Sequence, residues 1–311
     1  MNINDGISHN LHNLSKQCTN PYCKNPNCKC GDQCKCTPKN QCGSKEANPP
    51  KMILSKFVDE LPIPLVLKPR LKNEFYTYYE VNMTEFKQSL HSELHDTTVW
   101  GYEGGYPGPT IEVESGEKVF IKWINNLPDK HLLPVDYTVH GAHVDVPEVR
   151  TVVHVHGASV EWESDGYPEA WFTQGFKQVG PYFRKQIYRY DNYNRACTLW
   201  YHDHALGITR LNIYAGLAGF YLIRDHRERL LNLPSGKYEI PLMIQDKTFH
   251  KDGSLYYPKQ PEKPVPELET SIVPEFIGNT ILVNGKVWPY LKVEPRKYRF
   301  RLLNASNTRF Y

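Results

Sequence analysis

The sequence predicts an all-β protein, because three features of its pattern agree. Apolar and polar residues alternate over short stretches, turn-forming residues recur at regular intervals, and neither helical periodicity nor strand–helix–strand alternation is evident. At 311 residues the chain is long enough to bury a sizeable core and to hold one to three domains. The formal net charge of +3 and the 23% of charged residues give no sign of a nucleic-acid partner.

The sequence of residues 48–125 predicts an extended arm followed by strands. Residues 48–69 contain five prolines among apolar residues, and because proline interrupts strand pairing we expect an extended arm lying over a domain. Residues 75–86 give the first strong strand signal. Residues 110–125 alternate on both sides of a Ser115-Gly116 turn, which predicts a hairpin with one buried face.

Two His-x-His pairs carry the strongest chemical signal in the chain. His154 and His156 form one pair, His202 and His204 the other, and both stand among β-branched and aromatic residues. Residues i and i+2 of a strand point to the same face, so two such pairs facing each other would gather four imidazoles. One pair alone would more simply be a hydrogen-bonded pair on a strand surface. Two pairs favour a metal site. Among the first-row divalent metal ions, copper(II) generally binds nitrogen ligands most tightly, so copper is the first expectation.

At these histidines the sequence resembles a known family. The motifs that carry the resemblance, in chain order, are HVHG (154–157), SDGYPEAW (164–171), WYHDHA (200–205), DGSLYYP (252–258) and ILVNGKVWPYLKVEPRKYRFRLLNASNTR (281–309). Together they resemble the amino-terminal half of the multicopper oxidases, in the branch of bacterial spore-coat laccases and bilirubin oxidases. The resemblance covers residues 51–311.

The resemblance implies a cupredoxin-like Greek-key β-sandwich, with one complete domain plus part of a second. We expect residues 51–225 to form the complete domain, 226–235 a linker, and 236–311 an incomplete second domain. The last segment contains further strand signals, with turns at Asn284-Gly285 and Pro295-Arg296. An incomplete sandwich would leave an unpaired strand edge and an exposed apolar face.

The resemblance also implies roles for individual residues. By it His154 is a ligand of the type 2 copper, and His156, His202 and His204 are ligands of the type 3 copper pair. These would be half of the ligands of a trinuclear cluster, while the other half and the type 1 copper site would belong to a carboxy-terminal part absent from this sequence. Asp165 would deliver protons or support the cluster. It also starts an Asp-Gly turn in which Gly166 supplies a positive φ, and both descriptions can hold.

Two hypotheses of different classes follow. In the first, the chain is the amino-terminal portion of a laccase-like oxidase, which couples one-electron oxidation of phenolic, aminic, bilirubin-like or metal-ion donors to four-electron reduction of dioxygen to water. Its partners would be dioxygen, a small aromatic reducing substrate and a carboxy-terminal oxidase fragment, without which the chain is expected to be inactive. In the second, it is a non-catalytic copper-binding protein or a structural protein of a spore coat.

Residues 1–50 form a cysteine-rich tail with scarcely an apolar side chain, so the tail cannot build a hydrophobic core of its own. Three interpretations compete: a thiolate cluster for soft metal ions such as copper(I) or zinc, cross-linking to other cysteine-rich coat proteins, or an extension with incidental thiols. The odd number of thiols leaves at least one unpaired if all bridges are internal. The seven cysteines are Cys18, Cys23, Cys28, Cys30, Cys34, Cys36 and Cys42.

The eighth cysteine and five further histidines are weaker candidates. Cys197 and His202 have a spacing found in blue-copper sites, but the residues between them read as continuous strand, which would point the two side chains to opposite faces. A small buried thiol is the preferred interpretation of Cys197. The histidines expected at the surface or in loops are His91, His95, His131, His140 and His143.

No targeting or membrane signal is visible in the sequence. The first residues lack a basic region followed by an apolar run, and no apolar stretch of about eighteen residues occurs, so we expect neither a secretory signal nor a membrane span. Synthesis in the cytoplasm is the expectation. The resemblance adds deposition on a spore coat, which needs no signal peptide.

Overall fold

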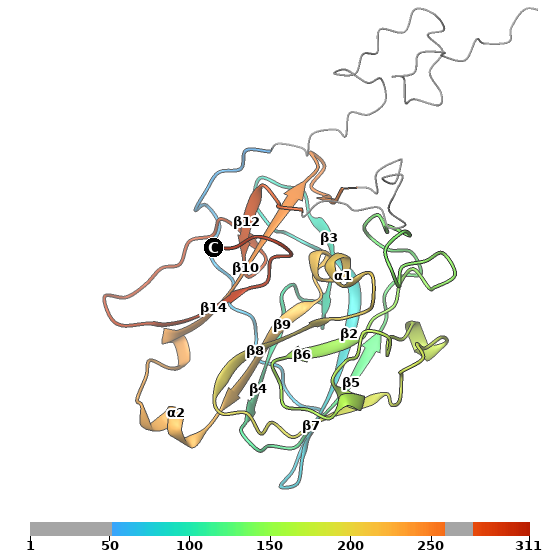
Figure 1. Cartoon of the computed structure of the whole chain (residues 1–311). Coiled ribbons are helices and arrows are strands. Elements are labelled where there is room, and N and C mark those ends of the chain that lie inside the picture. The colour runs from blue at the N-terminus through green and yellow to red at the C-terminus, as the bar shows by residue number, and fades with distance from the viewer. Residues whose placement is uncertain (1–51, 259–275) are drawn as a thin grey trace, which may run out of the picture. The chain divides into compact units, whose positions relative to one another are not determined.

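The structure is a computed structural model that describes residues 52–258 and 276–311 (Figure 1). The cysteine-rich tail of residues 1–50 lies outside the described residues, so the three interpretations of its thiols stay predictions. The described chain is built from short strands and a few short helices, which confirms the predicted all-β class.

One sheet has five strands and is centred on the long strand β2 (Thr77–Gln88). Along its first part β2 alternates buried and half-buried residues, as expected for a strand with one face on a core. Its order is β1-β2-β5-β7, with β3 also paired to β2. The bounds of these strands are β1 (Leu71–Lys72), β3 (Thr97–Tyr102), β5 (Val119–Asn125) and β7 (Ile187–Tyr190).

A second, four-stranded sheet carries most of both His-x-His pairs. Its strands, in the order in which they pair, are β4 (Gly108–Glu114), β9 (Ala218–Arg224), β8 (Cys197–Asp203) and β6 (Val153–His156). One face packs against the first sheet, where the ring of Tyr201 lies 4.8 Å from that of Tyr102 and 5.4 Å from that of Trp123. The two sheets therefore enclose one hydrophobic core and form the predicted sandwich.

The predicted hairpin of residues 110–125 is wrong, because β4 and β5 belong to different sheets. The chain does turn at Ser115-Gly116, but other segments bind that turn. Ser115 N donates to Arg224 O at 2.7 Å, and Gly116 N donates to Asn192 O at 2.8 Å. Two strands that bury one face against the same core from opposite sides show the same alternation as a hairpin, so the pattern leaves the sheet partner open.

Helices are few and short. α1 (Thr209–Ala215) follows the second His pair and is mostly buried. α2 (His226–Leu230) lies within the segment expected to be a linker, and the Asp225 carboxylate caps it by accepting a hydrogen bond from Glu228 N at 2.6 Å. Single 3-10 turns occupy residues 162–164, 174–176 and 236–238. Within the described ranges, none of the helices is long and apolar enough to cross a membrane.

A third sheet is formed within residues 239–304. Its central strand β10 (Glu239–Phe249) pairs in parallel with β14 and antiparallel with β11 and β12, and β13 pairs with β12. The other bounds are β11 (Leu255–Tyr256), β12 (Thr280–Val283), β13 (Lys286–Val287) and β14 (Arg299–Asn304). The expected turn at Asn284-Gly285 joins β12 to β13, with positive φ angles of 50° and 76°.

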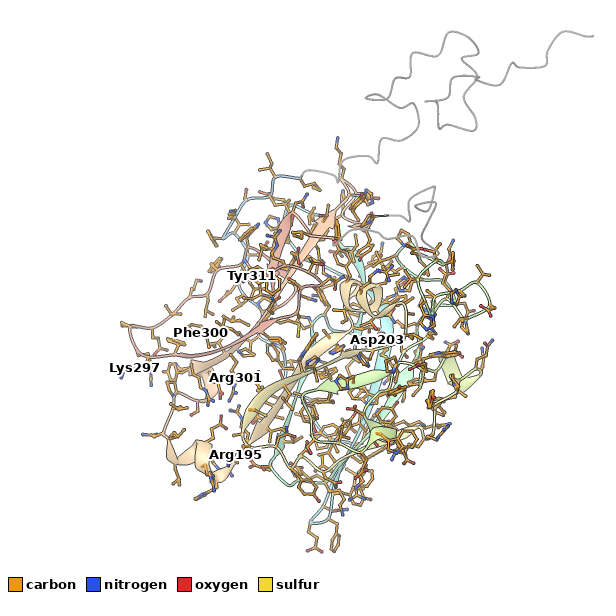
Figure 2. All side chains as sticks on the ribbon, in the orientation of Figure 1. Arg195, Asp203, Lys297, Phe300, Arg301 and Tyr311 are labelled. Atoms are coloured by element: carbon orange, nitrogen blue, oxygen red, sulfur yellow. The ribbon has the colours of Figure 1, made fainter. Side chains whose placement is uncertain are left out.

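β14 is an edge strand within the part of the chain that the structure describes, and it shows apolar side chains to solvent (Figure 2). Phe300 and Leu302 are 46% and 68% exposed, whereas Arg301 between them is only 6% exposed. The assignment of residues 51–225 and 236–311 to separate domains stays a prediction.

The proline-containing arm of residues 52–69 lies along two sheets in the described part of the chain. Leu61 N donates to Tyr290 O at 2.7 Å just after β13, and Leu67 N donates to Thr110 O of β4 at 2.8 Å. The arm is therefore extended, as its prolines indicate, and it is held by backbone hydrogen bonds at both places.

Candidate metal centre

The two His-x-His pairs come together because their strands are neighbours in one sheet. β6 and β8 pair antiparallel, with His154 directly opposite His202 and His156 opposite Trp200. Side chains of opposite residues in such a pair lie on the same face. The two pairs therefore lie side by side at one sheet face, where their imidazoles gather.

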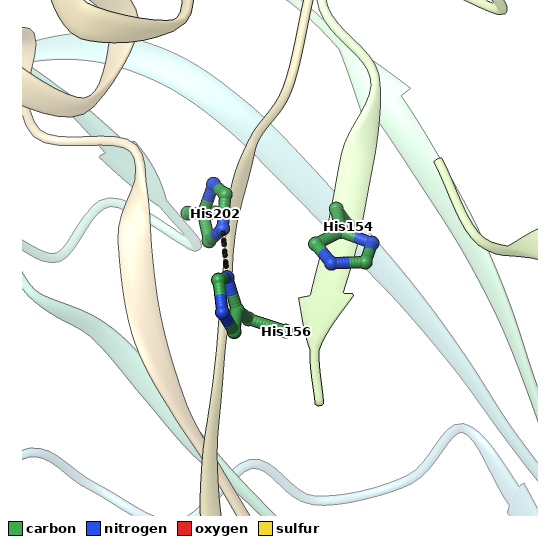
Figure 3. Close-up of side chains that lie close together, drawn as sticks. All are labelled: His154, His156 and His202. Carbon is green, nitrogen blue, oxygen red and sulfur yellow. Dashed lines mark hydrogen bonds between the residues drawn. The ribbon is translucent and has the colours of Figure 1, made fainter. Parts of the chain in front are cut away.

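Three of the four imidazoles converge closely (Figure 3). Ligand atoms of His154, His156 and His202 all lie within 4.8 Å of one another. The His156 Nδ1 atom lies 3.3 Å from His202 Nε2. The fourth imidazole, of His204, stacks on that of His154 with ring centroids 4.8 Å apart. The structure thus brings all four predicted ligands to one place.

Backbone carbonyls fix the orientation of three rings. The Nδ1 atom of His154 lies 2.5 Å from Asp165 O, that of His202 lies 2.7 Å from Asp203 O, and that of His204 lies 2.9 Å from Gly166 O. A carbonyl oxygen only accepts, so each Nδ1 must carry the proton. In His154 and His204 this leaves the Nε2 lone pair free, the form that binds a metal, whereas in His202 the Nε2 lone pair accepts a hydrogen bond from His156 Nδ1.

Burial keeps most of these imidazoles neutral. It lowers the pKa of His202 to about 3, opposed by the hydrogen bond to Asp203 O and reinforced by the neighbouring histidines. Burial lowers the pKa of His156 and of His204 as well. For His154 burial also acts to lower the pKa, but hydrogen bonds and charge from Asp165 outweigh it and raise the pKa. Neutral imidazole is the form that a metal ion needs.

Asp165 lies beside the first pair, as the sequence motif predicted. Its carboxylate Oδ1 is 3.2 Å from His154 Nδ1, and its side chain is 42% exposed, so the carboxylate contacts both the ring and solvent. Gly166 has a φ of 75°, which confirms the predicted turn geometry. A Cβ atom at Gly166 would stand 2.2 Å from Val153 O, so the turn packs directly on β6.

Sequence reasoning missed an aromatic contact of the site. The indole of Trp200 packs against the ring of His202, tilted by 33° with centroids 4.1 Å apart, and stacks on the ring of His156 at 5.7 Å. The signal was present in the strand period, because residues 200 and 202 of one strand share a face. This spacing did not by itself indicate a site contact, because a tryptophan on a strand usually packs in the core.

One of the five other histidines departs from expectation. His91 is fully buried and not at the surface, because its Nε2 atom bonds Ser55 O of the arm at 2.8 Å. His131 lies in a loop as predicted but is 6% exposed. The arm and the loop cover these rings, and neither cover is visible in local sequence. His95, His140 and His143 are exposed as expected.

Cys197 is a half-buried thiol that packs against the hydrophobic core. It begins β8, and five positions separate it from His202, which places the two side chains on opposite faces of the strand. The structure therefore supports the packing interpretation over a blue-copper pair.

Comparison with known proteins gives one consistent family. A multicopper oxidase family profile matches residues 84–148 and 145–228. The chain is 58% identical over 263 residues to a laccase of Bacillus subtilis (strain 168), covering 84% of this chain and 51% of the relative. It is 40% identical over 275 residues to the multicopper oxidase LPR1 of Arabidopsis thaliana, covering 83% and 46%. The chain thus spans about half the length of the curated relatives it matches.

Solved structures agree with these relatives. A laccase from Pediococcus acidilactici aligns with a TM-score of 0.63 and 26% identity, over 82% of this chain and 48% of that chain. The McoA multicopper oxidase from the hyperthermophile Aquifex aeolicus aligns with a TM-score of 0.58 and 28% identity, over 82% and 47%. These likenesses confirm the predicted cupredoxin-like sandwich.

Proposed function

Because the chain belongs to the multicopper oxidase family, we propose that it is the amino-terminal portion of a laccase-like oxidase. In this role His154 would be a ligand of the type 2 copper, and His156, His202 and His204 would be ligands of the type 3 pair. The observation that carries the proposal is the gathering of four imidazoles beside the β6–β8 strand pair, with the Nδ1–H groups of His154, His202 and His204 donated to backbone carbonyls so that Nε2 is the unprotonated atom.

The donor set fits copper. Imidazole nitrogen suits copper among the first-row metals, and no thiolate lies among the four rings within the described residues. A cation held by both His156 and His202 would have to displace the hydrogen bond that now joins His156 Nδ1 to His202 Nε2 at 3.3 Å. When bound, copper would supply the redox chemistry that reduces dioxygen to water.

Backbone carbonyls around the site orient the imidazoles, and the carboxylate of Asp165 is placed to transfer a proton. The carbonyl oxygens of Asp165, Asp203 and Gly166 orient three rings. The Asp165 carboxylate Oδ1 lies 3.2 Å from His154 Nδ1 and is also open to water, so it can carry a proton from solvent to the edge of the site. Proton delivery by Asp165 is thus part of the proposal.

The proposed partners follow from the share of the relatives that the chain covers. Half of the cluster ligands and the type 1 copper would come from a carboxy-terminal oxidase portion. Dioxygen would be the electron acceptor, and a phenolic, aminic, bilirubin-like or metal-ion compound the donor. Deposition on a spore coat belongs to the same proposal. By itself the chain is expected to bind copper but not to oxidise a phenol.

A second candidate function is a non-catalytic copper-binding or coat-structural role. One observation favours it: ligand atoms of His154, His156 and His202 lie within 4.8 Å of one another without any contribution from a second chain. Three imidazoles are enough to hold a single copper ion.

One experiment separates the two roles. The purified chain is loaded with copper(II), and its oxidation of 2,6-dimethoxyphenol with oxygen uptake is measured with and without a carboxy-terminal fragment of the Bacillus subtilis laccase. The matched control is the double variant His154→Ala/His202→Ala. Activity that requires both the fragment and the histidines would support the oxidase role. Activity of the chain alone would contradict the expectation that it needs a carboxy-terminal portion, and copper bound without activity in either case would favour the binding role.

A further inference from the structure

Between the two histidines of the second pair, Asp203 points away from the metal-binding face (labelled in Figure 2). Neighbouring residues of a strand alternate between faces, so the His202 imidazole lies on one side of β8 and this carboxylate on the other. Asp203 is 0% exposed. A buried carboxylate is costly unless it receives hydrogen bonds, so its partners show what it holds in place.

The carboxylate joins the backbone of two separate segments. Its Oδ2 atom accepts a hydrogen bond from Val152 N at 3.1 Å, and Oδ1 accepts one from Ala205 N at 3.0 Å. Val152 directly precedes the strand that carries His154, and Ala205 directly follows His204. Val152 O in turn accepts from His204 N at 2.8 Å. The side chain therefore ties the start of one histidine segment to the end of the other.

The backbone oxygen of the same residue orients a ligand ring. Asp203 O accepts the Nδ1–H of His202 at 2.7 Å. The peptide that the carboxylate anchors is thus the peptide that fixes this imidazole. A shift of Asp203 would turn the His202 ring and its Nε2 lone pair with it.

Asn212 of α1 adds a second connection between the same segments. Its Nδ2 atom donates to Asp203 Oδ1 at 2.8 Å and to Arg150 O at 3.1 Å. Both of these partners only accept, so the other amide atom is the oxygen Oδ1, which lies 2.9 Å from His131 Nε2 and accepts its proton. The orientation of the amide is therefore determined, and each of its polar atoms is bonded.

From these contacts we infer that Asp203, supported by Asn212, is a positioning residue that sets the spacing and ring orientation of His154, His202 and His204 for metal binding. We call the two side chains the Asp203–Asn212 clamp. The inference rests on the proposed function, since it gives the clamp a role in a copper site. A purely structural carboxylate would need only to satisfy its donors, whereas this one accepts from the backbone next to both histidine segments and from Asn212 of α1.

The test compares Asp203→Asn with a matched control, Asp246→Asn, on the full chain. Asp246 is also buried and accepts from Gly278 N at 2.5 Å, but it lies on β10 in the third sheet. Asn at 203 keeps the side-chain volume and one acceptor oxygen while turning an NH₂ group toward Val152 N. Both variants lose a buried carboxylate, so a general loss of stability affects both.

Copper(II) affinity is measured by competition with a chelator, and nitrogen hyperfine coupling in the EPR spectrum identifies copper bound to imidazole and not to tail thiols. We expect Asp203→Asn to weaken imidazole binding by roughly 10- to 100-fold, the usual effect of losing a group that orients a ligand, while Asp246→Asn leaves it unchanged. Equal affinities for wild type and Asp203→Asn would overturn the inference. If Asp203→Asn fails to fold, Asn212→Ala carries the same test with a smaller expected loss.

A metal-free readout separates this inference from the proposed function. In the ¹⁵N spectrum of the histidine rings, wild type should show His202 and His204 as single Nδ1–H tautomers, and Asp203→Asn should show tautomer averaging. If wild-type chain binds no copper through imidazole, the proposed function fails and the ring spectra alone decide the clamp. Ring spectra that are the same in wild type and Asp203→Asn would refute the clamp whether or not copper binds.

Discussion

His154 on β6 and His202 on β8 stand directly opposite each other in one antiparallel strand pair. Their separation is therefore set by the backbone ladder and not by flexible loops. A slip of one residue in this register would turn one whole pair to the other face of the sheet, so the register itself is part of the site. The imidazoles are thus ordered before any metal binds, which would lower the ordering cost of the proposed copper binding.

Because Trp200 packs against the His202 ring, we expect copper binding to change the tryptophan fluorescence. Copper(II) is paramagnetic and quenches a nearby indole strongly, and Trp200 is 4.1 Å from the His202 ring between centroids. We expect Trp200→Phe to remove the largest share of the copper-induced loss of tryptophan fluorescence. The control is Trp288→Phe, whose indole instead packs under the Lys56 amine. Undiminished quenching in Trp200→Phe would place the bound copper away from the four histidines.

Local features were predictable from sequence, and non-local ones were not. The strand period puts His154 beside His156, and the Asp-Gly and Asn-Gly sequences predict turns whose positive φ the structure confirms at Gly166 and Gly285. The pairing of β4 with β9 in place of β5 depends on contacts far apart in the chain, so alternation alone could not reveal it.

The same limit explains the buried side chains that the sequence did not reveal. His91 reads as a surface residue because the arm that covers it is more than thirty positions away, through a bond to Ser55. Asp203 reads as a polar residue between two ligands, and only the β6–β8 register shows that its carboxylate reaches Val152. Such partners are set by tertiary structure, which a single sequence does not display.

Because the turn at Gly166 packs tightly on β6, we expect a methyl group added there to affect both stability and copper binding. Gly166→Ala would place a Cβ atom 2.2 Å from Val153 O and 2.9 Å from His154 Cα, so β6 must shift. The control is Gly116→Ala, because Gly116 also has a positive φ, of 82°, but no atom lies within 4 Å of the added Cβ.

The expected outcome separates backbone strain from the clash. Gly116→Ala should lower the free energy of unfolding by about 1 kcal/mol, the cost of a left-handed conformation for a residue with a Cβ. Gly166→Ala should cost at least about 2 kcal/mol more and should also weaken copper binding, because His154 moves. Urea unfolding and copper titration measure the two effects. Equal losses for the two variants would show that the packing of this turn on β6 does not position the ligand.

Because the amine of Lys247 is buried, we expect the free energy of unfolding to depend on pH. Its side chain is fully buried, its amine bonds Tyr214 O, and it lies over the rings of Tyr214 and Tyr106. Burial lowers its pKa from 10.5 to about 7, and the charge of Asp246 only partly opposes this. Between these two values the unfolded chain binds a proton that the folded chain does not. The folded state therefore gains stability as pH rises through this window and loses it as pH falls toward 7.

The variant Lys247→Met tests how much this amine contributes to the change of unfolding free energy with pH. Relative to it, wild type should lose up to about 1.4 kcal/mol of unfolding free energy for each pH unit between pH 9 and pH 7. Urea unfolding at several pH values measures the difference. Lys177→Met, which alters an exposed lysine, should follow wild type throughout. A constant difference between Lys247→Met and wild type over this range would mean that the buried amine does not change its charge there.

The buried guanidinium of Arg301 predicts that β14 is fastened by an ion-pair network. Its Nε atom lies 2.5 Å from Glu239 Oε1, one terminal nitrogen lies 2.7 Å from Glu228 Oε1, and the other donates to Thr198 Oγ1 at 2.7 Å. These partners connect β14 to β10, α2 and β8. The side chains of Arg301, Glu239 and Glu228 are 4%, 7% and 9% exposed, so water cannot replace a lost partner.

Arg301→Met should therefore lower the free energy of unfolding by up to about 3 kcal/mol, because it removes the most deeply buried of the three guanidinium groups that pair with Glu228 and Glu239, while Arg224 and Arg299 remain. The loss should vary little with salt, since buried pairs are poorly screened. The control is Arg229→Met, which breaks an ion pair to Glu114 whose side chains are 57% and 48% exposed, and which should change stability little. Urea unfolding at low and high salt measures both variants. A loss for Arg301→Met no larger than that for Arg229→Met would show that the network does not fasten β14 to the rest of the chain.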